Sequence, residues 1–135
     1  MFDNISFLYV DDDQNSCQVM ELIMEKVMGV KNLVIFGDST DFLARAKALK
    51  PRPSIILLDI HMAPYSGFEM LSMIRADIEL QSITVIALTG SVMSEEVAEL
   101  RNKGFDGAIS KPLSVAVFPK LIERIIAGET VWHIG

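Results

Sequence analysis

Apolar residues gather in five short runs along the chain, and a polar residue or a turn signal ends each of them. These runs are Ile5–Val10, Leu33–Phe36, Ser54–Leu58, Ile83–Leu88 and Ala108–Ser110. Runs this short and this evenly apolar are typical of strands that are buried on both faces of a parallel sheet. The pattern therefore predicts five buried strands.

The segments between the runs place apolar residues at helical spacing. We expect helices over residues 14–28, 41–49, 68–74, 94–100 and 121–126. Asp13 is the expected cap of the first helix, Ser39 or Thr40 that of the second, and Ser94 that of the fourth. Gly29 is expected to end the first helix.

Strand and helix alternate five times, which favours an α/β fold. We expect a five-stranded parallel sheet with the flavodoxin-like strand order 2-1-3-4-5 and helices on both faces. The length of 135 residues fits one domain, here taken as residues 1–128. Residues 129–135 are then a C-terminal tail or the start of a linker.

Composition and charge exclude several classes of protein. The net charge of -6 argues against direct nucleic acid binding by this domain. No apolar run approaches the roughly 20 residues that span a bilayer, so we expect no membrane partner. The chain start lacks a signal-peptide pattern. The single cysteine, Cys17, fits a reducing, cytoplasmic location.

Chemistry-bearing residues follow four of the five predicted strands. Asp11 and Asp12 follow the first, Asp59 the third, Thr89 the fourth and Lys111 the fifth. In a parallel sheet these strand ends share one edge, where ligands bind in open α/β folds. Clustered carboxylates repel one another, and a hard divalent cation such as Mg²⁺ relieves the repulsion. With a lysine and a hydroxyl, the set predicts a phosphoryl-transfer site in which an aspartate can be the nucleophile.

Four motifs at these strand ends resemble the receiver domain of bacterial response regulators, the chemotaxis regulators among them. The resemblance covers about residues 5–126. The motifs are VDD at 10–12, LLDIHM at 57–62 with a glycine at 67, ALTG at 87–90 and SKP at 110–112. Each motif alone is weak, but their joint order at successive strand ends is specific.

The resemblance implies a phosphoacceptor and a metal site. Asp59 would accept a phosphoryl group from a phosphohistidine on a histidine kinase or phosphotransfer protein. Asp12 would ligate Mg²⁺ (or Mn²⁺) directly, together with Asp59. Asp11 would act mainly through water, and the backbone carbonyl of His61 would be a further ligand.

The resemblance also implies a switch rather than an enzyme with a substrate of its own. Lys111 would pair with the acceptor carboxylate and then with the phosphoryl oxygens, and Thr89 would move to bond the phosphoryl group. We expect a cis peptide bond between Lys111 and Pro112. The output would be an unidentified partner protein or an output domain outside this sequence.

The sequence departs from the family pattern in three places. The proline expected at position 63 stands at Pro64, Ser66 replaces a common aspartate, and Ala108 replaces the switch aromatic. If residues 105–110 are extended, Phe105 and Ala108 leave opposite faces of the sheet. We therefore expect the switch signal to run through the backbone of residues 90–94.

Two other functions use similar residues. A haloacid-dehalogenase-like phosphatase also needs Asp, Mg²⁺ and Lys. Asp11 and Asp13 have its spacing, but Asn15 fills the position where that family has a threonine or valine. A pseudo-receiver would keep the fold as a binding module without the switch. Ala108 favours this alternative, whereas the complete set of acids, threonine and lysine argues against it.

Overall fold

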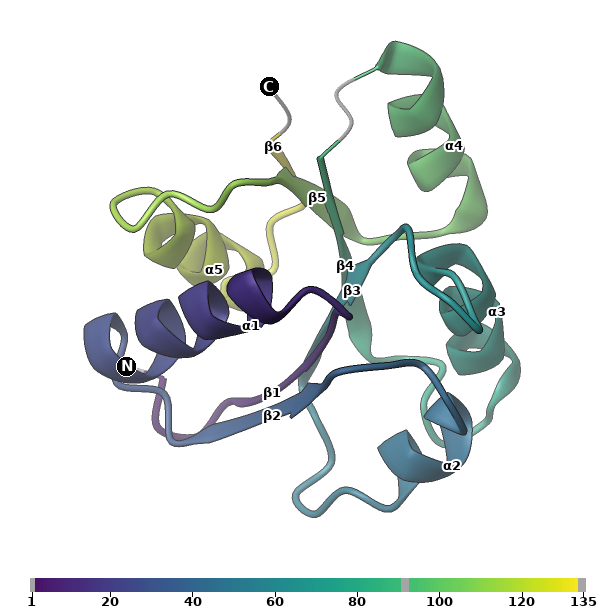
Figure 1. Ribbon diagram of the computed structural model, residues 1–135, viewed down its shortest axis with the longest axis horizontal. Coiled ribbons are helices and arrows are strands. Elements are labelled where there is room, and N and C mark those ends of the chain that lie inside the picture. Colours follow the sequence, from purple (N-terminus) through teal and green to yellow (C-terminus); the bar gives the residue numbers. More distant parts are fainter. Residues whose placement is uncertain (1, 91–92, 134–135) are drawn as a thin grey trace.

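The computed structural model describes residues 2–90 and 93–133. Within them the strands form one sheet in the order β2-β1-β3-β4-β5-β6, and all neighbouring pairs are parallel (Figure 1). The strands are β1 (Ser6–Val10), β2 (Asn32–Phe36), β3 (Ile55–Asp59), β4 (Thr84–Thr89), β5 (Gly107–Ser110) and β6 (Val131–His133).

Helices cover both faces of this sheet. α1 and α5 lie on one face, and α2, α3 and α4 lie on the other (Figure 1). The helices are α1 (Gln14–Glu21), η1 (Leu22–Val27), α2 (Phe42–Lys47), α3 (Gly67–Ala76), α4 (Ser94–Lys103) and α5 (Phe118–Ile126). The predicted α/β class and the order of the first five strands are confirmed.

The prediction of five strands is wrong, because residues 131–133 add a sixth. β6 pairs in parallel with β5, with Ala108 opposite Trp132. Val131 is buried in the core beneath α1 and α5, and Trp132 packs on the opposite face. Each face thus receives one apolar side chain, but a run of three residues is too short to distinguish from a tail in the sequence.

The helix caps agree with the sequence only in part. The Asp13 carboxylate caps α1 as predicted, accepting from the Ser16 N–H at 3.0 Å. The caps predicted for α2 and α4 are wrong, because Asp41 and Met93 occupy these positions and neither contributes a side-chain cap. The Ser39 hydroxyl is instead bonded to the backbone of the loop before α3.

Two apolar clusters fill the space between the sheet and its helices, one on each face. Phe105 and Ala108 belong to the same cluster, together with Leu100 of α4. The prediction that they leave opposite faces is therefore wrong. Phe105 precedes β5, so the alternation of an extended strand does not reach it. Of the loop expected to carry the switch signal, residues 91–92 lie outside the described part of the chain.

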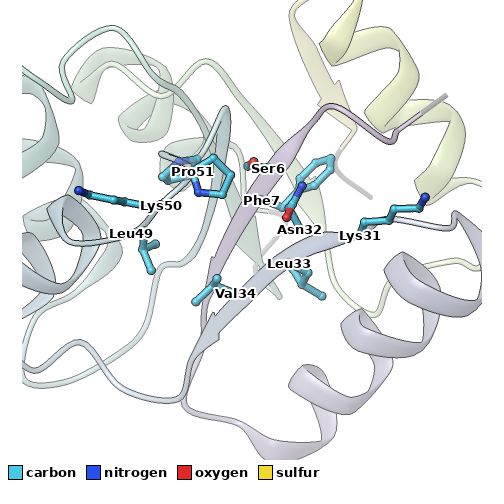
Figure 2. A pocket seen from close by; sticks show the side chains of 10 residues that line it. Ser6, Phe7, Lys31, Asn32, Leu33, Val34, Leu49, Lys50 and Pro51 are labelled. Carbon is cyan, nitrogen blue, oxygen red and sulfur yellow. The ribbon is translucent and has the colours of Figure 1, made fainter.

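A pocket opens at the amino ends of β1 and β2, where Ser6, Asn32 and Pro51 contribute to its lining (Figure 2). Its lining contains none of the predicted site residues. The pocket thus lies at the edge opposite to the strand ends that carry the acids.

Two further features bear on the sequence predictions. The Lys111–Pro112 peptide bond is cis, as predicted, and so is the bond between Ala63 and Pro64. Among the described residues, no helix combines the length and the apolar character needed to cross a bilayer.

Candidate functional site

Three carboxylates meet at the carboxyl edge of the sheet. Asp11 and Asp12 follow β1, and Asp59 is the last residue of the adjacent strand β3. One oxygen atom from each of the three lies within 4.8 Å of the others. Asp11 and Asp59 are buried, whereas Asp12 is exposed. The site therefore combines two sheltered carboxylates with one that faces solvent.

The Lys111 ammonium links the two buried carboxylates. Its Nζ lies 3.0 Å from Asp11 Oδ2 and 3.3 Å from Asp59 Oδ1. Lys111 directly follows β5, and its N–H bonds to the carbonyl of Thr89 at the end of β4. The sheet thus brings together the acids, the lysine and the threonine that the sequence placed at its strand ends.

Tyr9 contacts the Asp11 carboxylate through its hydroxyl, and the sequence analysis missed this contact. The buried Tyr9 hydroxyl donates to Asp11 Oδ2, the same oxygen that contacts Lys111, and the Asp13 N–H donates to Oδ1 at 3.0 Å. Tyr9 and Asp11 are two residues apart and so lie on the same side of an extended chain. A buried tyrosine hydroxyl usually has a hydrogen-bond partner, so a tyrosine two residues before an aspartate was the sequence signal for this contact.

Burial dominates the electrostatics of Asp59. Burial raises the pKa of Asp59 to about 6, and the negative charge of Asp11 adds to the increase, while Lys111 opposes it. Burial lowers the pKa of Lys111, but its hydrogen bond to Asp11 and the charges of Asp59 and Asp11 outweigh this effect and leave the pKa raised. The Lys111 ammonium thus faces the side chains of both Asp11 and Asp59.

The loop after Asp59 ends at the start of α3, where a capping box and a close backbone contact position it. Ser66 and Glu69 form a capping box at the start of this helix, so the residue that departs from the family pattern serves as a helix cap. A Cβ at Gly67 would lie 2.7 Å from the Asp59 carbonyl oxygen and 2.9 Å from Ile60 Cα. A glycine is therefore required where α3 meets the end of β3.

The Thr89 hydroxyl is engaged by a residue of α4. It donates to Glu96 Oε1 at 3.2 Å, and the same oxygen lies 3.3 Å from His61 Nε2. The His61 side chain is 70% exposed, and His61 lies with Asp12 on a hollow beside the acids. Glu96 is a second residue that the sequence analysis missed, because its contact depends on how α4 packs.

The donor set fits a hard divalent cation. Carboxylate oxygens are the ligands that Mg²⁺ prefers, and such sites usually use one or two carboxylates and retain several waters. Asp12 and Asp59 offer these oxygens beside an open hollow. A nucleophilic carboxylate with a cation site and a lysine is the equipment for phosphoryl transfer.

The sequence matches the response regulator receiver domain family over residues 7–123. The chain belongs to this family. Receiver domains act in two-component signalling, as signalling modules rather than classical enzymes, and bind Mg²⁺ through acidic residues. This receiver domain has such acidic residues, Asp11, Asp12 and Asp59, clustered at its sheet edge.

Curated relatives and solved structures agree with this assignment. The polar-differentiation response regulator DivK of Brucella anthropi is 40% identical over 78 residues, which make up 58% of this chain and 61% of that protein. This match therefore spans about three fifths of the relative's length. Vibrio cholerae chemotaxis protein CheY4 superimposes with a TM-score of 0.78 at 24% identity, covering 90% of this receiver domain and 98% of that chain.

A receiver domain of a signal transduction histidine kinase from Syntrophus aciditrophicus has the same fold. It superimposes with a TM-score of 0.78 at 22% identity, covering 91% of this chain and 90% of that one. Identities this low establish the fold alone.

Proposed function

We propose that this receiver domain is a phosphorylation switch whose acceptor is Asp59. The observation that carries the proposal is the position of the Lys111 ammonium, 3.3 Å from Asp59 Oδ1 and 3.0 Å from Asp11 Oδ2. A fixed cation beside a buried carboxylate is suited to neutralise the charge that a phosphoryl group brings.

The transfer uses the Asp59 carboxylate as the nucleophile. A carboxylate oxygen attacks the phosphorus of a phosphohistidine, an acyl phosphate bond forms, and the bond between phosphorus and nitrogen breaks with its electron pair left on the imidazole. Lys111 then pairs with phosphoryl oxygens, and Thr89 donates its hydroxyl hydrogen to another. The domain catalyses at most its own phosphorylation and dephosphorylation.

Asp12, Asp59 and the His61 carbonyl would hold Mg²⁺ or Mn²⁺, with Asp11 acting through water. Both Asp11 oxygens already accept hydrogen bonds from protein donors, which supports an indirect role for this residue. When bound, the cation neutralises charge on the transferring group. Asp12 faces solvent and would be the most accessible of the three carboxylates to such an ion.

The partner that supplies the phosphoryl group is a histidine kinase or a phosphotransfer protein, and the location is the cytoplasm. A further protein, or an output domain outside this sequence, reads the phosphorylated state. The domain binds neither nucleic acid nor membrane directly, in keeping with its net charge of -6.

Phosphorylation by acetyl phosphate tests the proposal. With Mg²⁺ the wild-type protein should gain one phosphoryl group by mass spectrometry, and Asp59→Asn should gain none. Asp13→Asn is the matched control, because the Asp13 side chain caps α1 and contacts Asp11 only through its backbone N–H, and it should still be labelled. Labelling of Asp59→Asn to the wild-type level would refute Asp59 as the acceptor.

A metal titration tests the cation site. Mg²⁺ should bind weakly and with little selectivity over Mn²⁺, because few protein ligands are present and waters complete the shell. Asp12→Ala should weaken binding in an NMR titration. Unchanged affinity in Asp12→Ala would exclude Asp12 as a ligand.

A further inference from the structure

Glu96 connects the site to the first turn of α4. One of its oxygens, Oε1, accepts the Thr89 hydroxyl at 3.2 Å and lies 3.3 Å from His61 Nε2. Three elements therefore meet at one carboxylate oxygen: the end of β4, the loop after β3, and α4. The Thr89 side chain is buried, and only 22% of the Glu96 side chain is exposed.

This contact competes with the switch. A threonine hydroxyl has one hydrogen to donate, and an ionised glutamate only accepts. A Thr89 hydroxyl that donates to Glu96 therefore has to change partner before it donates to a phosphoryl oxygen. Bonds to a charged acceptor are stronger than neutral ones, especially where water is partly excluded.

We propose that Glu96 is a positioning residue that holds Thr89 and α4 in the unphosphorylated arrangement, so that phosphorylation of Asp59 must draw Thr89 away from it. The inference rests on the proposed function, because it assigns Thr89 to the phosphoryl group. Loss of the Thr89 bond removes the contact between Glu96, in the first turn of α4, and the end of β4. His61 Nε2 then remains as the other contact of Glu96 Oε1.

The affinity for beryllofluoride, a phosphoryl mimic, tests this role in the full chain with Mg²⁺. A ligand shifts an equilibrium by its differential affinity for the two states, so removal of a restraint on the free state should tighten binding. We expect Glu96→Ala to bind about three- to tenfold more tightly than wild type, in line with the net worth of one typical intramolecular hydrogen bond. Glu96→Gln, which keeps an acceptor oxygen, should show a smaller gain.

Two controls separate the bond from the charge. Glu95→Ala removes the same charge from an exposed neighbour in the same helical turn and should leave the affinity near wild type. In a Thr89→Ala background, Glu96→Ala should give no further gain, because the bond is already absent. An equal gain in Glu95→Ala, a gain that persists without the Thr89 hydroxyl, or no gain in Glu96→Ala would each overturn the proposal.

A measurement without the mimic keeps this test distinct from that of the proposed function. Without beryllofluoride, the NMR signal of the Thr89 methyl group should shift in Glu96→Ala and stay in place in Glu95→Ala. A wild-type protein that fails to bind beryllofluoride would refute the proposed function, whereas an unmoved Thr89 signal in Glu96→Ala would refute the role of Glu96.

Discussion

Asp59 is buried, but the role proposed for it as phosphoacceptor requires a charged carboxylate, and these two conditions conflict. Burial raises its pKa from 3.8 to about 6, with a further contribution from the Asp11 charge. Folding therefore increases the affinity of this carboxyl group for a proton. The stability that the protonated form contributes is fully present below about pH 4 and is lost as the pH rises through about 6.

Asp59→Asn should consequently stabilise the metal-free protein at neutral pH. We expect its free energy of unfolding to exceed that of wild type by about 1–2 kcal/mol near pH 7.5, because the neutral amide avoids the cost of a buried charge. The difference should shrink towards about pH 4. Urea denaturation in EDTA across this range measures it. Asp12→Asn, at an exposed position, is the control and should show a weaker pH dependence.

Tyr9→Phe should destabilise the protein, because it removes a donor from the fully buried Asp11 carboxylate. We expect a loss of about 1–3 kcal/mol in the free energy of unfolding. Tyr65→Phe is the matched control, because Tyr65 contacts Ser39 through its backbone. It should change stability by less than about 0.5 kcal/mol. Equal losses in the two variants would show that the Tyr9 hydroxyl contributes nothing particular to this site.

Among individual residues, the sequence predicted those whose positions follow from the sheet topology alone. Asp59, Thr89 and Lys111 stand at strand ends, and parallel strand ends converge whatever the side chains do. Tyr9 and Glu96 were missed because their roles depend on side-chain direction and on how a helix packs.

The helices around the site begin and end at features, such as helix caps and backbone conformation, that short sequence motifs specify only in part. The capping box of α3 is readable in the sequence as a serine followed three residues later by a glutamate, although Ser66 also stands where the family commonly has an aspartate. The start of α2 was not readable, because Asp41 adopts a left-handed backbone with φ of 49°. The last turns of the first helical segment form a π-helix, a departure that helical spacing does not reveal.

Ser66→Ala should cost about 1 kcal/mol of stability, because it removes the acceptor for the Glu69 N–H at the start of α3. The matched control in the same helix is Ser72→Ala, at an exposed interior position where alanine is the better helix former. It should be neutral or slightly stabilising. Thermal unfolding of both variants decides the matter, and a neutral Ser66→Ala would mean that the capping box adds no stability.

For the whole molecule, alternation and strand order followed from the sequence, but the extent of the sheet did not. β6 lies where a tail was expected. It contributes Val131 to one core cluster and Trp132 to the other face, where the Arg101 guanidinium lies 4.5 Å from the centre of the tryptophan ring. A strand that adds to both faces stabilises the domain as a whole.

Truncation after Gly128 should therefore lower the free energy of unfolding by about 2–4 kcal/mol, because it uncovers the edge of β5 and the apolar surface beneath Val131 and Trp132. The dependence of this energy on urea concentration should also fall, since less surface is exposed on unfolding. His133→Ala, at an exposed position of the same strand, should change little. A truncated protein as stable as wild type would show that β6 is dispensable.

The parallel direction of β6 decides where a tether on this domain would attach. Helix α5 runs back from the carboxyl end of β5 to the amino end of β6, so a chain that left the domain after α5 would depart on the side away from the acids. β6 returns the chain to the side of the acids, because its backbone runs again towards the carboxyl edge of the sheet. At His133 it lies three strands, or about 15 Å, from β3, the strand that ends in Asp59. A bulky fusion behind His133 would therefore stand at the same edge of the sheet as the acids. A fusion before β1 would leave from the opposite edge of the sheet and would not cover the acids.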